Sequence, residues 1–458
     1  MWATGAARRR RPELVLRDGS RVAVIGGGPA GSFFSIFLLD MAQRLGLDLS
    51  LEIHEPRDYS RPGPASCNMC GGIISESLVQ SLAAEGINLP PTVVERGIDS
   101  YVMHMEAGSV RIRTPLAEKR IAAVHRGAGP RGVKDWSWRS FDGYLQELAL
   151  GRGATLIPSR VEEVTWTDGR PTLRGRDGEA RTYDLLVVAT GVNSSLPKAL
   201  AKLNLGYRSP GTTKTYICEM ALGGEAIRER FGNSMHVFLL DIPRLEFAAL
   251  IPKAEHVTMC LLGESIDKEL IQTFLASPEV QSCLPSGWSI REDTCHCAPL
   301  MNVRPGRHPY ADRVVFIGDC GVARLYKDGI GSAYRTAKAA AVTAAFDGIS
   351  ARDFRRRYGP ACRAIRTDNT IGRIVFAIAG QQRKRLHDAR GILRMAALEQ
   401  QLPGDRRYMS TVLWDIFTGS APYREVFLRT LHPRFWGRMV WEILKGVASG
   451  SRAMERAA

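Results

Sequence analysis

The stretch "RVAVIGGGPAGSFF", residues 21–34, decides the fold. Its apolar run at 21–25 predicts a buried parallel strand, and the residues from 30 to 45 predict a helix that follows directly. Between them, Gly26, Gly28 and Gly31 flank Pro29 and Ala30 with Gly-x-Gly-x-x-Gly spacing. The three glycines permit a tight bend, a close main-chain approach to a pyrophosphate, and close helix packing. Together with the amides of the helix N-terminus, they predict a dinucleotide site.

Three later segments indicate which dinucleotide is bound. The strand "LSLEIHEP" delivers Glu55, whose carboxylate suits ribose hydroxyls. The strands "TYDLLVVATG" and "DRVVFIGD" end at Gly191 and at Gly318-Asp319, where Asp319 suits a ribityl hydroxyl. A helix then begins near Gly329-Ile330-Gly331, and its amides suit the pyrimidine edge of a flavin. These features favour FAD over NAD, and no second glycine turn of this kind occurs between Gly191 and Gly318.

All four segments, in this order, resemble the glutathione-reductase-type FAD domain, in particular its aromatic-hydroxylase-like branch and the FAD-dependent geranylgeranyl reductase family. Cys70-Gly71-Gly72 resembles that family's loop beside the isoalloxazine, and "FAALIPKAEHVTMCLLG" resembles its strand bordering the substrate cavity. "WRSFDGYL" resembles its Arg-x-x-Phe-Asp-x-x-Leu helix, which implies that Arg139 binds FAD. The chain departs from the family at Tyr326–Lys327, where the family has a proline, and segment 123–138 has no assigned counterpart.

The resemblance implies an FAD-dependent oxidoreductase that reduces a hydrophobic substrate, either the C=C bonds of an isoprenoid lipid or a quinone. Hydride would leave flavin N5, and Cys70 is a candidate proton donor. The alternative is that Cys70 is only a small residue that fits a tight loop. The electron donor would be NAD(P)H or a ferredoxin-like protein. Three other functions stay open: a single-component FAD/NAD(P)H monooxygenase, an RNA-modifying flavoprotein and an electron-transfer protein. Since no recognition module is present, we expect no nucleic-acid partner.

Cysteine and histidine usage gives weaker signals. Nine cysteines, an odd number, favour a reducing compartment over a disulfide framework. Cys67 and Cys70 have the spacing of a redox pair, and with Cys295 and Cys297 they resemble a zinc set, but an incidental origin is favoured for both. We therefore predict no metal. The histidines at 54, 104, 125 and 236 have no triad-like context, which favours structural or exposed positions.

The net charge of +15 is concentrated at the two ends of the chain. Residues 351–458 carry 21 Lys/Arg against 9 Asp/Glu, and residues 1–20, which make a poor secretory signal, carry 5 against 2. Residues 435–448 predict an amphipathic helix, with Phe435, Met439, Ile443 and Val447 on one line and Trp436, Val440 and Leu444 beside it. Two hypotheses follow: this face packs on the core, or it contacts an anionic membrane surface.

The sequence predicts an α/β fold: a Rossmann-like FAD-binding domain, an inserted β-rich substrate domain and a helical C-terminal region. The FAD-binding parts are 20–95, 139–204 and 312–350, the substrate segments are 96–138 and 205–311, and the basic helical region is 351–458. No apolar run is long enough to suggest a membrane-spanning helix. We expect a cytoplasmic protein, or one peripheral on a membrane.

Overall fold

The computed structural model describes residues 14–67, 69–115, 121–131, 139–203, 205–291 and 294–455. A six-stranded sheet in the order β20-β21-β12-β1-β2-β8 carries the glycine turn. Its central strands pair in parallel, with Val22 opposite Leu185 and Arg21 opposite Ser50. This arrangement confirms the predicted Rossmann-like layer. The strands are β1 (Arg21–Ile25), β2 (Ser50–His54), β8 (Thr155–Ile157), β12 (Leu185–Val188), β20 (Tyr310–Ala311) and β21 (Val314–Phe316).

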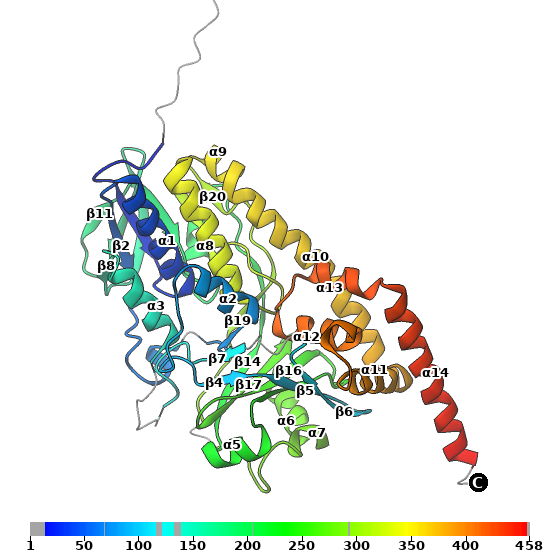
Figure 1. The fold of residues 1–458 in the computed structure, drawn as a ribbon. Coiled ribbons are helices and arrows are strands. Elements are labelled where there is room, and N and C mark those ends of the chain that lie inside the picture. Colours follow the sequence, from blue (N-terminus) through cyan, green and yellow to red (C-terminus); the bar gives the residue numbers. More distant parts are fainter. Residues whose placement is uncertain are drawn as a thin grey trace, which may run out of the picture.

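Successive side chains of β1 point to opposite faces of this sheet, and both faces are buried. Val22 and Val24 face α1 (Pro29–Leu45), α3 (Phe141–Leu150) and α8 (Gly329–Phe346). Ala23 and Ile25 face a small antiparallel sheet on the opposite side. Figure 1 shows α1 and α8 packed alongside each other. The small sheet consists of β9 (Val161–Thr167), β10 (Arg170–Gly175) and β11 (Ala180–Thr182).

A seven-stranded sheet forms the second layer, in the order β18-β14-β17-β16-β15-β5-β6. β16 and β17 pair in antiparallel fashion and form a hairpin around Pro252–Glu255. One face packs against the C-terminal helices and the other against α5 (Gly224–Arg230), α6 (Lys268–Ala276) and α7 (Pro278–Gln281). The strands are β5 (Ser100–Met105), β6 (Gly108–Arg113), β14 (Tyr216–Ala221), β15 (Ser234–Phe238), β16 (Leu245–Pro252), β17 (His256–Gly263) and β18 (His296–Cys297).

The C-terminal region is helical, as predicted. Side chains of α11 and α12, such as Met395 and Trp414, share one core with Tyr101 and Ile112 of the seven-stranded sheet. Figure 1 shows α14 extending past this sheet to the C-terminal end of the chain. No helix among the described residues has the length and apolar character needed to cross a bilayer. The helices are α10 (Gly359–Arg383), α11 (Leu386–Glu399), α12 (Tyr408–Thr418), α13 (Tyr423–Thr430) and α14 (Pro433–Glu455).

Short elements connect the two sheets. A three-stranded sheet has the order β3 (Ile73–Ile74), β7 (Ile121–Ala123), β4 (Arg96–Ile98). In the chain, α2 (Glu76–Ala84) follows β3 and comes before the other two strands. A two-stranded sheet pairs β13 (Gly211–Lys214) with β19 (Leu300–Arg304). Two further short α-helices are α4 (Leu196–Leu200) and α9 (Ala351–Asp353). Most strands of the six-stranded sheet come from segments 20–95, 139–204 and 312–350, with β20 the exception. The exact domain boundaries stay predictions.

Candidate functional site

A cavity of about 340 Å³ lies between the two sheets, within the size range of ligand sites. The glycine turn, the Cys-Gly-Gly loop and the ends of two strands line one side, and the seven-stranded sheet lines the other. The lining includes most of the residues that the sequence predicts for the site: Gly26, Gly28, Pro29, Ala30, Glu55, Cys70, Gly191, Asp319, Gly329 and Ile330.

The glycine turn brings bare main chain to the cavity. Gly26 has φ +105°, and a Cβ there would lie 2.6 Å from the carbonyl oxygen of Ala189. A Cβ on Gly31 would lie 1.9 Å from the carbonyl oxygen of Gly26. Neither position can therefore carry a side chain without displacing backbone. Gly28 is the N-cap of α1, so the positive end of this helix meets the cavity.

Glu55 is buried beside the turn, with its carboxylate fixed by three donors. The amide of Gly27 donates to Oε2 at 2.9 Å, the amide of Arg57 donates to Oε1 at 2.9 Å, and the Tyr59 hydroxyl donates to Oε2 at 3.1 Å. This network holds an acidic group at the end of β2, as the sequence predicts for a ribose contact.

The opposite end of the polar side lies at the start of α8. Asp319 is half-buried in the lining, and burial raises the pKa of its carboxyl. Gly318 and Gly331 lie outside the lining and serve close packing instead. A Cβ on Gly318 would lie 2.8 Å from Ala30 Cβ, and one on Gly331 would lie 2.1 Å from Asp328 Oδ1.

Two buried polar atoms support a polar ligand on this side. Thr190 Oγ1 and Asn302 Oδ1 have no hydrogen-bond partner among the described residues, and both residues line the cavity. Buried polar groups are nearly always paired, so unpaired ones that face a cavity indicate a missing partner. Together with the side-chain-free glycine turn, they fit FAD, which carries hydroxyl, phosphate and ring-nitrogen partners.

Arg139 is not among the arginines that line the cavity, which are Arg57, Arg126 and Arg324. Arg139 is exposed and pairs with Glu147 on the surface of α3, so the structure does not bring it to the lining. Arg126 lines the cavity and donates from Nη2 to Asp142 Oδ2 at 2.8 Å. Asp142 is fully buried near the start of α3, and this carboxylate holds the pKa of Arg126 above its ordinary value. The Phe-Asp part of the predicted motif therefore positions a different arginine.

The Cys-Gly-Gly loop lies at the junction of the two sides. Cys70, Gly71 and Gly72 all line the cavity, and a Cβ on Gly71 would lie 2.8 Å from Cys260 Sγ. All nine cysteines are free. Burial raises the pKa of the Cys67 thiol, which disfavours the thiolate that a redox pair needs. Within the described residues, no three of the four cysteines of the zinc alternative converge on one point.

Lys327 belongs to the Tyr326–Lys327 segment, where the sequence departs from the family's proline. In the structure it lines the cavity just before α8, and its Nζ lies 4.4 Å from the ring centre of Phe247 and 4.2 Å from that of Phe417. Burial, with a smaller contribution from the Arg324 cation, holds the pKa of Lys327 well below its ordinary value. An amine with a lowered pKa releases its proton more readily than an ordinary lysine does, which suits a general acid.

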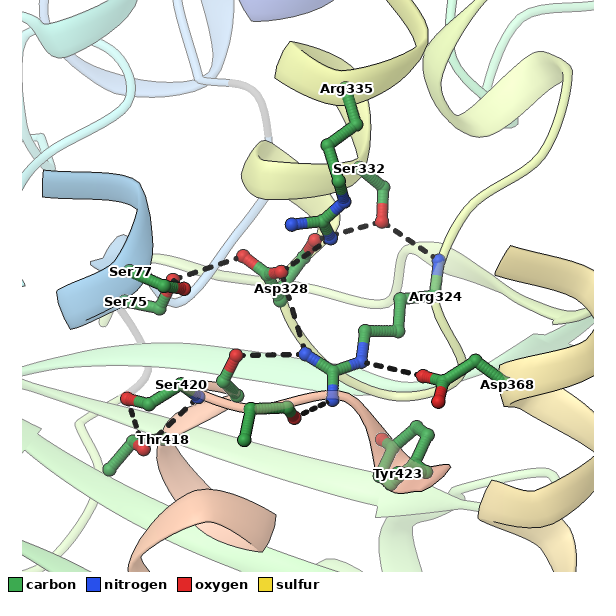
Figure 2. A network of polar contacts seen from close by, with 12 residues as sticks. Ser75, Ser77, Arg324, Asp328, Ser332, Arg335, Asp368, Thr418, Ser420 and Tyr423 are labelled. Atoms are coloured by element: carbon green, nitrogen blue, oxygen red, sulfur yellow. Dashed lines mark hydrogen bonds and ion pairs between the residues drawn. The ribbon is translucent and has the colours of Figure 1, made fainter. Parts of the chain in front are cut away.

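Figure 2 shows how the C-terminal region fixes the loop that carries Lys327. Arg324 donates to the carbonyl oxygens of Gly419 and Ala421, and it pairs with Asp368 at 3.4 Å. Asp328 accepts from Ser75 at 3.2 Å and from Arg335 at 2.6 Å. The loop is therefore held at both ends, on either side of Tyr326 and Lys327. Tyr326 and Asp328 have φ +59° and +55°, a left-handed conformation that these contacts maintain.

The side of the cavity opposite the glycine turn is apolar. We call it the apolar wall, and it combines the inner face of the seven-stranded sheet with Phe417 of α12. Ile251, just before the Pro252–Lys253 turn, belongs to the lining, whereas Lys253 is buried outside it and pairs with Glu219 at 3.2 Å. The sheet contributes Ile217, Met235, Val237, Phe247, Ala249, Ile251, Cys260 and Leu262.

Comparisons with known proteins find similar reductases. No protein-family profile matches the chain. The curated geranylgeranyl diphosphate reductase of Synechocystis sp. is 25% identical over 341 residues, which cover 70% of this chain and 74% of that protein. A crystal structure of a geranylgeranyl bacteriochlorophyll reductase-like protein from Thermoplasma acidophilum has a TM-score of 0.63 at 15% identity, covering 91% of this chain and 99% of that one. The chain is an FAD-dependent oxidoreductase that resembles geranylgeranyl reductases.

Other flavoproteins share the fold of this oxidoreductase. The halogenase PltM has a TM-score of 0.58 at 12% identity, covering 95% of this chain and 93% of that one. The flavin-dependent brominase Bmp2 has a TM-score of 0.57 at 14% identity, covering 95% of this chain and 100% of that one. At such low identities these likenesses concern the fold alone, so the reaction must be argued from the site.

Proposed function

We propose that this oxidoreductase reduces the carbon–carbon double bonds of an isoprenoid lipid. The observation that carries this proposal is the apolar wall, which faces the polar side of the cavity with side chains that suit the hydrocarbon chain of a lipid. The similarity to a geranylgeranyl diphosphate reductase supports the same substrate class. A quinone would also fit an apolar wall, and the experiment below distinguishes the two.

The polar side would hold FAD. The turn from Gly26 to Gly31 suits the diphosphate, Glu55 the ribose, and Asp319 the ribityl chain. Arg126 would supply positive charge close to the Cys-Gly-Gly loop, and the N-terminus of α8 would face the ring system. When bound and reduced, FAD supplies hydride for transfer to a substrate carbon.

Lys327 is our candidate for the proton that the second carbon of the double bond requires. Its ammonium group lies at the apolar wall between Phe247 and Phe417, so a substrate chain on this wall would lie beside it. Its lowered pKa makes proton release easier than from an ordinary lysine. Cys70 lines the same cavity and remains the second candidate donor.

We further propose that α14 contacts an anionic membrane surface. The structure divides the predicted apolar face of this helix: Phe435 and Met439 are buried in the core, which supports the packing hypothesis for that line. The neighbouring line, extended by Trp441, stays exposed; Ile443 and Val447 have side chains outside the described residues. Among the described side chains, the exposed large apolar ones on α13, on its C-cap and on α14 are Leu428, Leu431, Trp436, Val440, Trp441 and Leu444.

The charge beside this exposed line suits anionic lipid. Arg424 and Arg434 are exposed on the same two helices, and Lys445 lies 4.9 Å from the Trp441 ring. Tryptophan and cationic residues together are typical of interfacial helices. Co-sedimentation with phosphatidylserine vesicles tests this proposal: the double variant Trp436→Ser/Trp441→Ser should lose most binding, whereas Phe346→Ser, an exposed apolar residue on α8, should keep it. Equal vesicle binding by the wild type, the double variant and Phe346→Ser would contradict the proposal.

An anaerobic product analysis tests the reaction. The purified protein, supplied with FAD and chemically reduced, is incubated with geranylgeranyl diphosphate, and in a parallel sample with a quinone. We expect mass spectrometry to show the addition of two hydrogens for each reduced double bond of the isoprenoid. Incorporation of one oxygen atom under air, with NADPH and no anaerobic product, would support the monooxygenase alternative instead. Tests with NADPH and with a reduced ferredoxin would identify the electron donor.

A further inference from the structure

Two histidines and a cysteine converge on the side of the seven-stranded sheet that faces away from the cavity. His104 on β5 and His236 on β15 approach to 2.9 Å between Nε2 and Nδ1. Cys283, which follows α7, lies with its Sγ 3.2 Å from His236 Nδ1 and 3.7 Å from His104 Nε2. All three side chains are buried. Among the described residues, this is the one group of three or more such ligands that meets at a point.

The alternation of β15 separates this cluster from the substrate cavity. Met235 and Val237 line the cavity, so His236 between them points to the other face. His104 belongs to the neighbouring parallel strand, where it is paired in register with Phe238. Cys283 belongs to the core that α6 and α7 form on that face. The cluster therefore joins the helical segment to the sheet and has no part in the proposed reduction.

The three distances are those that one metal ion requires. A point equidistant from the three ligand atoms lies about 2 Å from each. Zinc bonds to imidazole nitrogen are about 2.0–2.1 Å long and those to thiolate about 2.3 Å long. The carbonyl oxygen of Glu279 lies 3.3 Å from Cys283 Sγ and offers a fourth donor nearby.

Ser109 and two phenylalanine rings contact the two histidines. Ser109 Oγ lies 2.8 Å from His104 Nδ1, the nitrogen that points away from the cluster, as expected for a metal-binding histidine. The His104 ring stacks on Phe238 at 4.6 Å, and the His236 ring lies 4.8 Å from Phe231. Among the described residues His236 Nε2 has no hydrogen-bond partner, so only His104 makes the second contact that is usual for a metal-binding histidine.

We propose that His104, His236 and Cys283 bind a zinc ion that stabilises the packing of α6 and α7 on the seven-stranded sheet. The nitrogen and sulfur donor set suits Zn²⁺ better than Mg²⁺ or Ca²⁺, which prefer oxygen. Binding replaces the thiol proton of Cys283, which is released to solvent, and no electron transfer is involved. The sequence gives no signal of this set, because its members come from three separate segments with no motif spacing.

Metal analysis of the full-length protein tests the proposal. After dialysis against Zn²⁺ and removal of free metal, we expect about one zinc per chain in the wild type and in Cys362→Ser, a control that removes an equally buried cysteine from α10. Cys283→Ser should lose this zinc. Substitution with Co²⁺ should give a thiolate-to-cobalt charge-transfer band in the wild type and none in Cys283→Ser.

A second variant keeps the proposal testable if Cys283→Ser folds poorly. Ser109→Ala removes only the contact to His104 Nδ1, and it should weaken Zn²⁺ binding by about tenfold or more. Zinc should also raise the melting temperature of the wild type and leave its FAD content unchanged. Absence of bound zinc from the wild type, with no effect of Zn²⁺ on its melting temperature, would overturn the proposal. Neither result depends on the reaction proposed above.

Discussion

On one side of the cavity the turn at residues 26–31 presents glycine main chain, whereas on the other side the seven-stranded sheet presents apolar side chains. The glycine side is fixed by contacts between backbone atoms, such as the close approach of Gly26 to Ala189, which leaves no space for a Cβ. The shape of the apolar wall depends on many side chains, and a change of size at one position can be compensated by its neighbours. We therefore expect the glycine side to tolerate almost no change and the apolar wall to tolerate moderate change.

The largest effect should come from Gly31→Ala. A Cβ at this position would lie 1.9 Å from the carbonyl oxygen of Gly26, so the turn must open and the FAD site must deform. We expect the purified variant to lose most of its bound FAD, measured as flavin absorbance per chain after gel filtration. The matched control is Gly380→Ala in α10, where a Cβ would meet nothing within 4 Å. A Gly31→Ala protein that keeps its full FAD content would contradict our account of the turn.

Lys327→Met should give the next largest effect, because it removes an acid from the boundary between the two sides. We expect the rate of substrate reduction to fall by about 10²–10⁴-fold, the usual contribution of a positioned acid, with FAD content unchanged. In the wild type the rate should fall as pH rises through the lowered pKa of Lys327, at a pH below the ordinary lysine value of about 10.4. This pH dependence should be absent from the variant. If Cys70→Ser shows the rate loss and Lys327→Met does not, Cys70 is the donor.

Glu55→Gln removes a negative charge from the glycine side of the cavity and keeps the size of the side chain. Glu55 accepts three hydrogen bonds, and an amide offers one acceptor oxygen in place of two. Since hydrogen bonds to charged groups contribute about 1.5–3 kcal/mol, we expect the Kd for FAD to rise about tenfold. Titration of the apoprotein, followed by flavin fluorescence, measures this Kd. Glu52→Gln, a neighbour on β2 that contacts Arg21 and Tyr183 outside the lining, should leave the Kd unchanged.

The same contrast explains what the sequence could predict. The turn at 26–31, Glu55 and Asp319 lie at strand ends, where local spacing alone brings them to one edge of a parallel sheet. Arg126 could not be predicted in this way, because its position depends on Asp142 in another element. The Arg-x-x-Phe-Asp motif contains this aspartate, but the resemblance assigned a role only to Arg139, the arginine nearest in sequence. The departure at Tyr326–Lys327 was the one signal that pointed to Lys327.

The C-terminal helices show the limit of periodicity as a guide. The apolar spacing of 435–448 predicted a helix with one broad apolar face, and the hypotheses of core packing and membrane contact stood side by side. The structure buries Phe435 and Met439 and leaves Trp436 and Val440 exposed on the same helix. Likewise, nothing in the sequence marks Phe417 as a cavity residue, because an apolar helix side chain looks the same whether it faces a core or a ligand.

The smallest effect should come from Val237→Thr on the apolar wall. The change keeps the shape of the side chain and places one hydroxyl at the substrate surface, where β15 faces the cavity. Because an unpaired hydroxyl against an apolar chain costs about 1–3 kcal/mol, we expect KM for the isoprenoid to rise about tenfold with kcat and FAD affinity unchanged. The control, Val102→Thr on the adjacent strand β5, lies outside the lining and should leave KM unchanged. If Val237→Thr instead weakened FAD binding and left KM intact, the wall would face the cofactor, and the division of the cavity into a cofactor side and a substrate side would be wrong.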